Sequence, residues 1–204
     1  VDSRLHICHL TTAGGVELVR WAKSRGIKVT AEVTPHHLLL TDNEVMGYDA
    51  IYKVNPPLRT ENDVLALRTG LADGTIDIVA TDHAPHPAES KECEWQYAAF
   101  GMLGLETALS IVWQTMIESK LMDMATLQRC MSSAPALIGR YHNQGLALTE
   151  GAPANLTLFA PNKNWKVDRD LVASKSKNTP FHGMEFAGRV FATYFEGRES
   201  WRLK

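Results

Sequence analysis

The sequence is poor in cysteine, with three residues among 204, and none of them forms a CxxC pair. Cys8, Cys93 and Cys130 are odd in number and widely spaced, which argues against a disulfide framework and favours free thiols in a reducing cytoplasm. No apolar run approaches the roughly 20 residues that a membrane-spanning helix needs. The first residues also lack the basic and apolar segments of a secretory signal. These absences predict a cytoplasmic protein without a membrane partner.

The sequence also has no large excess of positive or negative charge. The chain carries 21 Lys+Arg against 23 Asp+Glu, a formal net charge of −2. This balance gives no reason to expect nucleic acid as a partner. Hydrophobic residues make up 45% of the chain, which is ordinary for a globular protein and argues against disorder. The length suffices for one or two domains with a substantial core.

Short β-rich runs and longer amphipathic stretches alternate through the first 145 residues, as is typical of βα units in a parallel sheet or barrel. After about residue 145 the pattern changes to alternating runs typical of antiparallel strands, and we expect a small β-rich subdomain over residues 146–204. The predicted strands are 5–10, 27–33, 51–54, 76–81, 155–159 and 189–195, and the predicted helices are 16–23, 61–72, 102–119 and 123–133.

Polar side chains follow each of the first four predicted strands, where a (β/α)8 barrel gathers its catalytic groups. The densest group is residues 80–86 (ATDHAPH). Asp82 follows a buried apolar strand, so its carboxylate needs a metal ion, a cation or hydrogen bonds. Beside a metal-bound water it could act as a general base. The alternative, that Asp82 caps a loop and the nearby histidines lie on the surface, stays open.

The other strand-end residues lead to separate expectations. His6 and His9 are three residues apart, so on a regular strand they face opposite sides; we place His9 in the site and His6 in packing. A neutral imidazole is a good ligand for zinc-like ions. For His36 and His37 we expect a structural role, with a ring N–H on a backbone carbonyl. Asn55 is suited to present an amide to a substrate, and an ordinary turn asparagine is the alternative.

Four ordered segments now carry a resemblance to a known family. They are residues 6–12 (HICHLTT), 30–38 (TAEVTPHHL), 53–59 (KVNPPLR) and 80–86 (ATDHAPH). Together they resemble dihydroorotase, of the zinc-dependent bacterial class I type in the amidohydrolase superfamily. The resemblance continues through residues 100–107 and 178–181 and covers nearly the whole chain.

The resemblance implies a site and a reaction. His9 and Asp82 would be zinc ligands, with two zinc ions in a complete site, and Asp82 would also be the catalytic acid/base. Asn55, His86 and the backbone of Phe100 and Gly101 would bind the substrate. The implied reaction is the reversible hydrolysis of the cyclic amide of (S)-dihydroorotate to N-carbamoyl-L-aspartate, in pyrimidine biosynthesis.

One departure from the family concerns the metal ligands that precede these segments. The family's His-x-His pair and its bridging acidic residue or carboxylated lysine are absent, and only His9 and Asp82 remain. The chain also starts abruptly at Val1, just before a predicted strand. We therefore expect the C-terminal portion of a (β/α)8 barrel enzyme, made of its later βα units over residues 1–145, that needs the N-terminal portion as a partner for activity.

Two other functions stay open. One is a non-catalytic dihydroorotase-like protein that partners aspartate transcarbamoylase. The other is a different cyclic amidohydrolase of the hydantoinase or allantoinase type. A second copy of the chain, forming a homodimer, is a further candidate partner.

Overall fold

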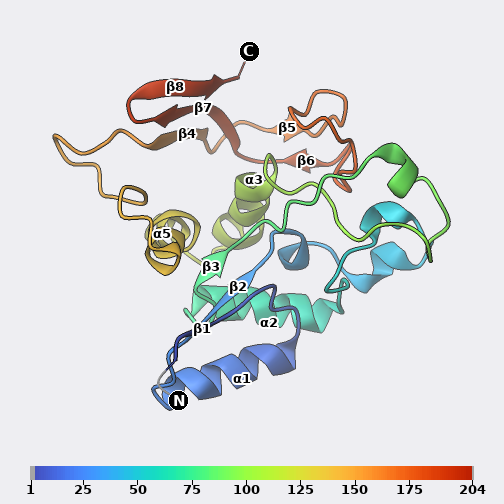
Figure 1. Ribbon diagram of the computed structural model, residues 1–204, viewed down its shortest axis with the longest axis horizontal. Coiled ribbons are helices and arrows are strands. Elements are labelled where there is room, and N and C mark those ends of the chain that lie inside the picture. The colour runs from blue at the N-terminus through green and yellow to red at the C-terminus, as the bar shows by residue number, and fades with distance from the viewer. Residues whose placement is uncertain (1–2, 204) are drawn as a thin grey trace.

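A computed structural model describes residues 3–203; the predicted abrupt start at Val1 lies outside the described residues. A three-stranded parallel sheet forms its first part, in the order β1-β2-β3 (Figure 1). The central strand β2 buries its apolar side chains, as expected of a strand covered on both faces. The strands are β1 (Leu5–Ile7), β2 (Val29–Val33) and β3 (Ile78–Val79).

Two helices connect these strands and lie side by side along the sheet (Figure 1). They are α1 (Ala13–Ser24) and α2 (Glu61–Ala72); α2 has the predicted bounds, whereas α1 begins three residues before the predicted start. Each begins at a threonine whose hydroxyl accepts a hydrogen bond from a backbone N–H of the first turn, Thr12 for α1 and Thr60 for α2. Their buried side chains join those of the sheet in one core, which includes Val16, Val19, Ala31, Val33, Leu67, Leu71 and Ile76.

The predicted strand at residues 51–54 is wrong. A 3₁₀ turn, Ala50–Tyr52, lies there instead, and the Asp49 carboxylate caps it by accepting from the Ile51 N–H at 2.9 Å. The carbonyl of Lys53 accepts from the Gly101 N–H, but residues 53 and 54 belong to no strand. Other 3₁₀ turns are His36–Leu38, Asp42–Val45 and Ala88–Ser90.

The two later helices differ from the prediction at their ends. The first begins at residue 108, six residues later than predicted, and Met102 instead forms an isolated parallel bridge with His83. It comprises α3 (Ala108–Val112) and a π-helical stretch, Trp113–Glu118. The second comprises α4 (Met124–Gln128), a π-helical stretch (Arg129–Ser133) and α5 (Ala134–Gly139), so it continues beyond residue 133.

The final part is β-rich, as the alternating pattern predicts. Antiparallel strands β4 (Leu156–Ala160), β7 (Arg189–Phe195) and β8 (Arg198–Arg202) form one sheet, and β5 (Trp165–Lys166) pairs with β6 (Glu185–Phe186). A second core joins this part to the first, because Phe181 and Phe186 pack in one cluster with Met102 and Ile111. That contact brings the segment before β6 close to the end of the parallel sheet.

The structure bears on two predictions from composition, which concern the cysteines and membrane-spanning helices. The three cysteines are free, as predicted; Cys8 and Cys93 are exposed, whereas burial raises the pKa of the Cys130 thiol to about 11. Among residues 3–203, no helix is both long and apolar enough to cross a membrane.

Candidate functional site

His9 and Asp82 meet at the carboxyl ends of β1 and β3. His9 Nε2 lies 3.7 Å from Asp82 Oδ1, and both side chains are partly exposed. Both residues have a left-handed backbone, with φ of +53° and +45°. This conformation is uncommon for residues other than glycine and clusters at functional sites. Both residues were expected in the site, and the structure brings them together.

Glu32, on β2, connects this pair to His6. Its Oε2 lies 2.9 Å from His6 Nε2, and its Oε1 lies 2.9 Å from His9 Nδ1, although the latter pair is not aligned for a regular hydrogen bond. Glu32 is buried, and the imidazole rings of His6 and His9 are the polar groups next to its carboxylate. The Nδ1 of His6 is in turn 2.8 Å from the Thr30 hydroxyl.

The expectation that His6 and His9 face opposite sides is therefore wrong. His6 pairs in register with Thr30, so it shares a face of the sheet with Thr30 and Glu32. The strand ends at Ile7, and the positive φ of His9 turns its ring to that same face. Sequence reasoning also missed Glu32. Acidic residues are rarely buried without a partner, so an acidic residue within a predicted buried strand could have identified Glu32 as a site residue.

His37 makes the contact that the sequence predicts for both His36 and His37, a ring nitrogen beside a backbone carbonyl. His36 does not, because its buried Nε2 has no hydrogen-bond partner among residues 3–203. The ring of His37 lies with Nε2 3.1 Å from the Pro56 carbonyl and Nδ1 2.7 Å from the Thr34 hydroxyl. Burial lowers the pKa of His37 to about 4. Burial, with the neighbouring His37 and His9, also holds the pKa of His36 well below its usual value. Both rings are therefore neutral at pH 7.

This burial predicts that the protein loses stability in mild acid. The unfolded chain protonates His37 near pH 6.5, whereas the folded protein resists protonation down to about pH 4. Between these values the unfolded state binds more protons, so the free energy of unfolding decreases as the pH falls. From pH 7 to pH 5 the loss due to His37 is about 2 kcal/mol.

Urea denaturation at pH 7 and pH 5 measures this loss. In His37→Gln the difference between the two pH values should shrink by about 2 kcal/mol. His142→Gln, at an exposed position, is the matched control and should retain the wild-type difference. An unchanged difference in His37→Gln would contradict the assignment.

The expected substrate-binding residues lie in three neighbouring segments, around Asn55, His86 and Phe100–Gly101. His86 Nε2 is 2.8 Å from the Phe100 carbonyl. Gly101 is buried with φ of +132°, and a Cβ there would lie 2.4 Å from the Ala84 Cβ and 3.0 Å from His86 Nε2. Asn55 is exposed. Two residues before it, the Lys53 carbonyl accepts from the Gly101 N–H, and directly after it the Pro56 carbonyl faces His37.

Two buried lysines hold the loop between these segments. Lys53 Nζ donates to the carbonyls of Trp95 and Ala98, at 2.6 and 2.7 Å. Lys91 Nζ donates to the carbonyls of Ala99 and Gly101, at 2.9 and 3.0 Å. Burial and the nearby Lys53 ammonium lower the pKa of Lys91 to about 8. These bonds fix the path of the chain that leads to Phe100 and Gly101.

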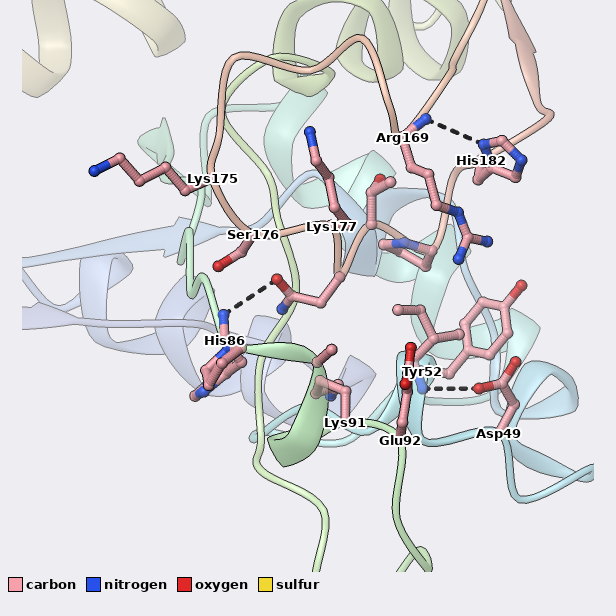
Figure 2. A pocket seen from close by; sticks show the side chains of 16 residues that line it. Asp49, Tyr52, His86, Lys91, Glu92, Arg169, Lys175, Ser176, Lys177 and His182 are labelled. Carbon is pink, nitrogen blue, oxygen red and sulfur yellow. Dashed lines mark hydrogen bonds between the residues drawn. The ribbon is translucent and has the colours of Figure 1, made fainter.

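A cavity of about 520 Å³ opens beside His86 (Figure 2). Arg169, Lys175 and Lys177 lie on one side of it, and Asp49 and Glu92 on the other. His9 and Asp82 do not line this cavity. The cavity and the His9–Asp82 pair are therefore distinct parts of the structure.

The His9–Asp82 pair fits a zinc ion by its donor chemistry and spacing. Two ligands of a tetrahedral zinc with bonds near 2.0–2.1 Å lie about 3.4 Å apart, and the 3.7 Å between His9 Nε2 and Asp82 Oδ1 is close to that. His6, Cys8 and Glu32 also have donor atoms within 4.8 Å of one another. Both ring nitrogens of His6 already have partners, so this second set is less suited to a metal.

No family model matches the chain, but individual proteins do. The dihydroorotase of Streptomyces coelicolor is 61% identical over 97% of this chain and 46% of its own length. That of Mycobacterium tuberculosis is 51% identical over 96% of this chain and 46% of its own length. This chain is a relative of the dihydroorotases. It spans about half the length of the dihydroorotases that it matches.

Solved structures of cyclic amidohydrolases share the fold. An L-hydantoinase from Arthrobacter aurescens superimposes with a TM-score of 0.91 at 32% identity, over 98% of this chain and 45% of the other. A dihydropyrimidinase from Brevibacillus agri gives a TM-score of 0.90 at 22% identity, over the same shares of both chains. These two solved structures thus share the α/β arrangement of this chain.

Proposed function

We propose that this chain contributes part of the active site of a dihydroorotase, which catalyses the reversible hydrolysis of (S)-dihydroorotate to N-carbamoyl-L-aspartate in pyrimidine biosynthesis. The single observation that supports it best is the His9–Asp82 pair, 3.7 Å apart just beyond the ends of β1 and β3, in a chain 61% identical to a dihydroorotase. Residues 1–145 would be the later βα units of a (β/α)8 barrel, and residues 146–204 a β-rich subdomain. The free cysteines favour the cytoplasm as its location.

The roles of the residues follow from their positions. His9 and Asp82 would hold zinc, with two ions in a complete site, and His9 would be oriented from its other nitrogen by Glu32. Zinc, when bound, polarises the amide carbonyl and makes water acidic enough to react near neutral pH. Asp82 would take the proton of the attacking water and return it to the leaving ring nitrogen, so one carboxylate serves both half-steps.

The substrate would lie between Asp82 and the paired segments beyond it. Asn55 would bind the ring amide, and His86 would lie near the substrate carboxylate. The backbone of Phe100 and Gly101 would hold the edge of the ring. The N-terminal portion of the same enzyme would supply the remaining metal ligands. A second copy of the chain and aspartate transcarbamoylase are the further partners that we propose.

The test is an assay of the protein as its source makes it, with intact mass, bound zinc and turnover measured together. Cyclisation of N-carbamoyl-aspartate, with zinc bound and a mass near twice 22.6 kDa or a co-purifying second piece, would support the proposal. Faster turnover of hydantoins would favour another cyclic amidohydrolase, in line with the hydantoinase neighbours. A single 22.6 kDa species without zinc or turnover would favour the non-catalytic alternative.

A further inference from the structure

Asn178 links two of the three segments that carry the proposed substrate-binding groups. It lies between β5 and β6, far along the chain from both segments, and is only 4% exposed. Its Nδ2 donates to the Ala84 carbonyl at 2.9 Å and to the Gly101 carbonyl at 3.3 Å. Its Oδ1 accepts from the His86 N–H at 3.2 Å, the bond drawn dashed beside His86 in Figure 2. One carboxamide thus bridges three backbone groups.

The backbone of Asn178 adds a fourth link. Its carbonyl accepts from the Leu103 N–H at 3.1 Å, just beyond Gly101. Phe181, three residues later, is almost fully buried in the second core and anchors the segment. The carboxamide is therefore held from the β-rich part as well as by the segments that it connects.

The two linked segments approach each other so closely that their spacing is sensitive to this bridge. His86 Nε2 is 2.8 Å from the Phe100 carbonyl, and the space beside Gly101 would not accept a Cβ. The carbonyls of Ala84 and Gly101 point at one amide group. Without that group, two buried or partly buried carbonyls lose a donor, and leaving such a group unpaired is unfavourable.

We propose that Asn178 is a positioning residue that sets the spacing between His86 and the Phe100–Gly101 backbone and thereby the affinity for substrate. This inference rests on the proposed function, in which those groups bind dihydroorotate. Only a carboxamide of this length offers two donors and one acceptor in one plane. An aspartate side chain has the same shape, but in its ionised form it would place an acceptor oxygen, instead of the amide donor, against the carbonyls of Ala84 and Gly101.

The test compares Asn178→Asp with wild type in the full protein as its source makes it, purified with its metal. The KM for dihydroorotate should rise between about tenfold and a hundredfold, because small displacements of positioning groups weaken binding strongly. The kcat should change by less than about threefold, since Asp82 and His9 are not among the contacts of Asn178. Bound zinc should stay the same. A merely structural role would lower stability without this split between KM and kcat.

Asn155→Asp is the matched control. Asn155 also joins two segments, with Nδ2 donating to the Asn143 carbonyl at 2.9 Å and Oδ1 accepting from the Glu196 N–H at 2.7 Å, but it lies in the β-rich part away from His86. This variant should leave the KM unchanged. If Asn178→Asp does not fold, Asn178→Ala, which buries no charge, is measured in its place.

Hydrogen exchange separates failure of this inference from failure of the proposed function. In the Asn178 variant, exchange should accelerate at residues 84–86 and 100–103 whether or not the protein turns over dihydroorotate. Wild type without turnover would refute the proposed function, and the exchange result would still decide whether Asn178 sets the spacing. Unchanged exchange in these segments, or an unchanged KM in an active protein, would overturn the inference.

Discussion

Replacing Asp82 with alanine is expected to remove nearly all turnover, by about 10³-fold or more, while the protein still folds. Asp82 is the carboxylate nearest to His9 Nε2, and in the proposed mechanism it moves the proton in both half-steps. It is partly exposed, so its loss leaves no large cavity in the core. Steady-state kinetics in both directions measure the effect, and circular dichroism verifies the fold.

Asp77→Asn is the matched control for Asp82. Asp77 precedes the same strand β3 but lies at its opposite end, where it accepts from Lys23 Nζ and from the Ala31 N–H, both at 2.8 Å. Its substitution should lower stability and leave kcat almost unchanged. A normal kcat in Asp82→Ala would refute the assignment of Asp82 as acid/base.

Replacing Glu32 with alanine is expected to weaken zinc binding by about 10–100-fold. The carboxylate lies 2.9 Å from both His6 Nε2 and His9 Nδ1, so its loss leaves the ring of His9 without the group that orients it. Glu32→Gln keeps the shape and one acceptor oxygen, and should give a smaller loss. Competition with a chromophoric chelator measures the affinity directly, without reference to turnover.

Glu17→Ala is the control for Glu32. Glu17 is an exposed carboxylate on α1 that pairs with Arg20, and such surface pairs contribute little. Its loss should leave the zinc affinity at the wild-type value. Equal affinities in Glu32→Ala and wild type would show that Glu32 serves only packing on β2.

Local patterns predicted the regular elements well and the irregular ones poorly. The threonine caps and apolar spacing of α1 and α2 are properties of neighbouring residues, so the sequence predicts the bounds of α2 closely and those of α1 to within three residues. The run at residues 51–54 has the composition of a strand, but the carboxylate of Asp49 caps a 3₁₀ turn there. The predicted helix from residue 102 likewise starts only at residue 108, and Met102 forms an isolated bridge with His83, a residue distant in the sequence.

Sequence alone determined that this is an α/β protein of balanced charge with free thiols, and that His9 and Asp82 lie at strand ends. Those properties follow from composition and periodicity, which act over a few residues. Only the tertiary structure decided that His6 shares the face of His9, that Glu32 lies between them and that Asn178 joins the segments of His86 and Gly101. A positive φ and hydrogen bonds across 26 to 94 residues produce these contacts, and no local pattern encodes them.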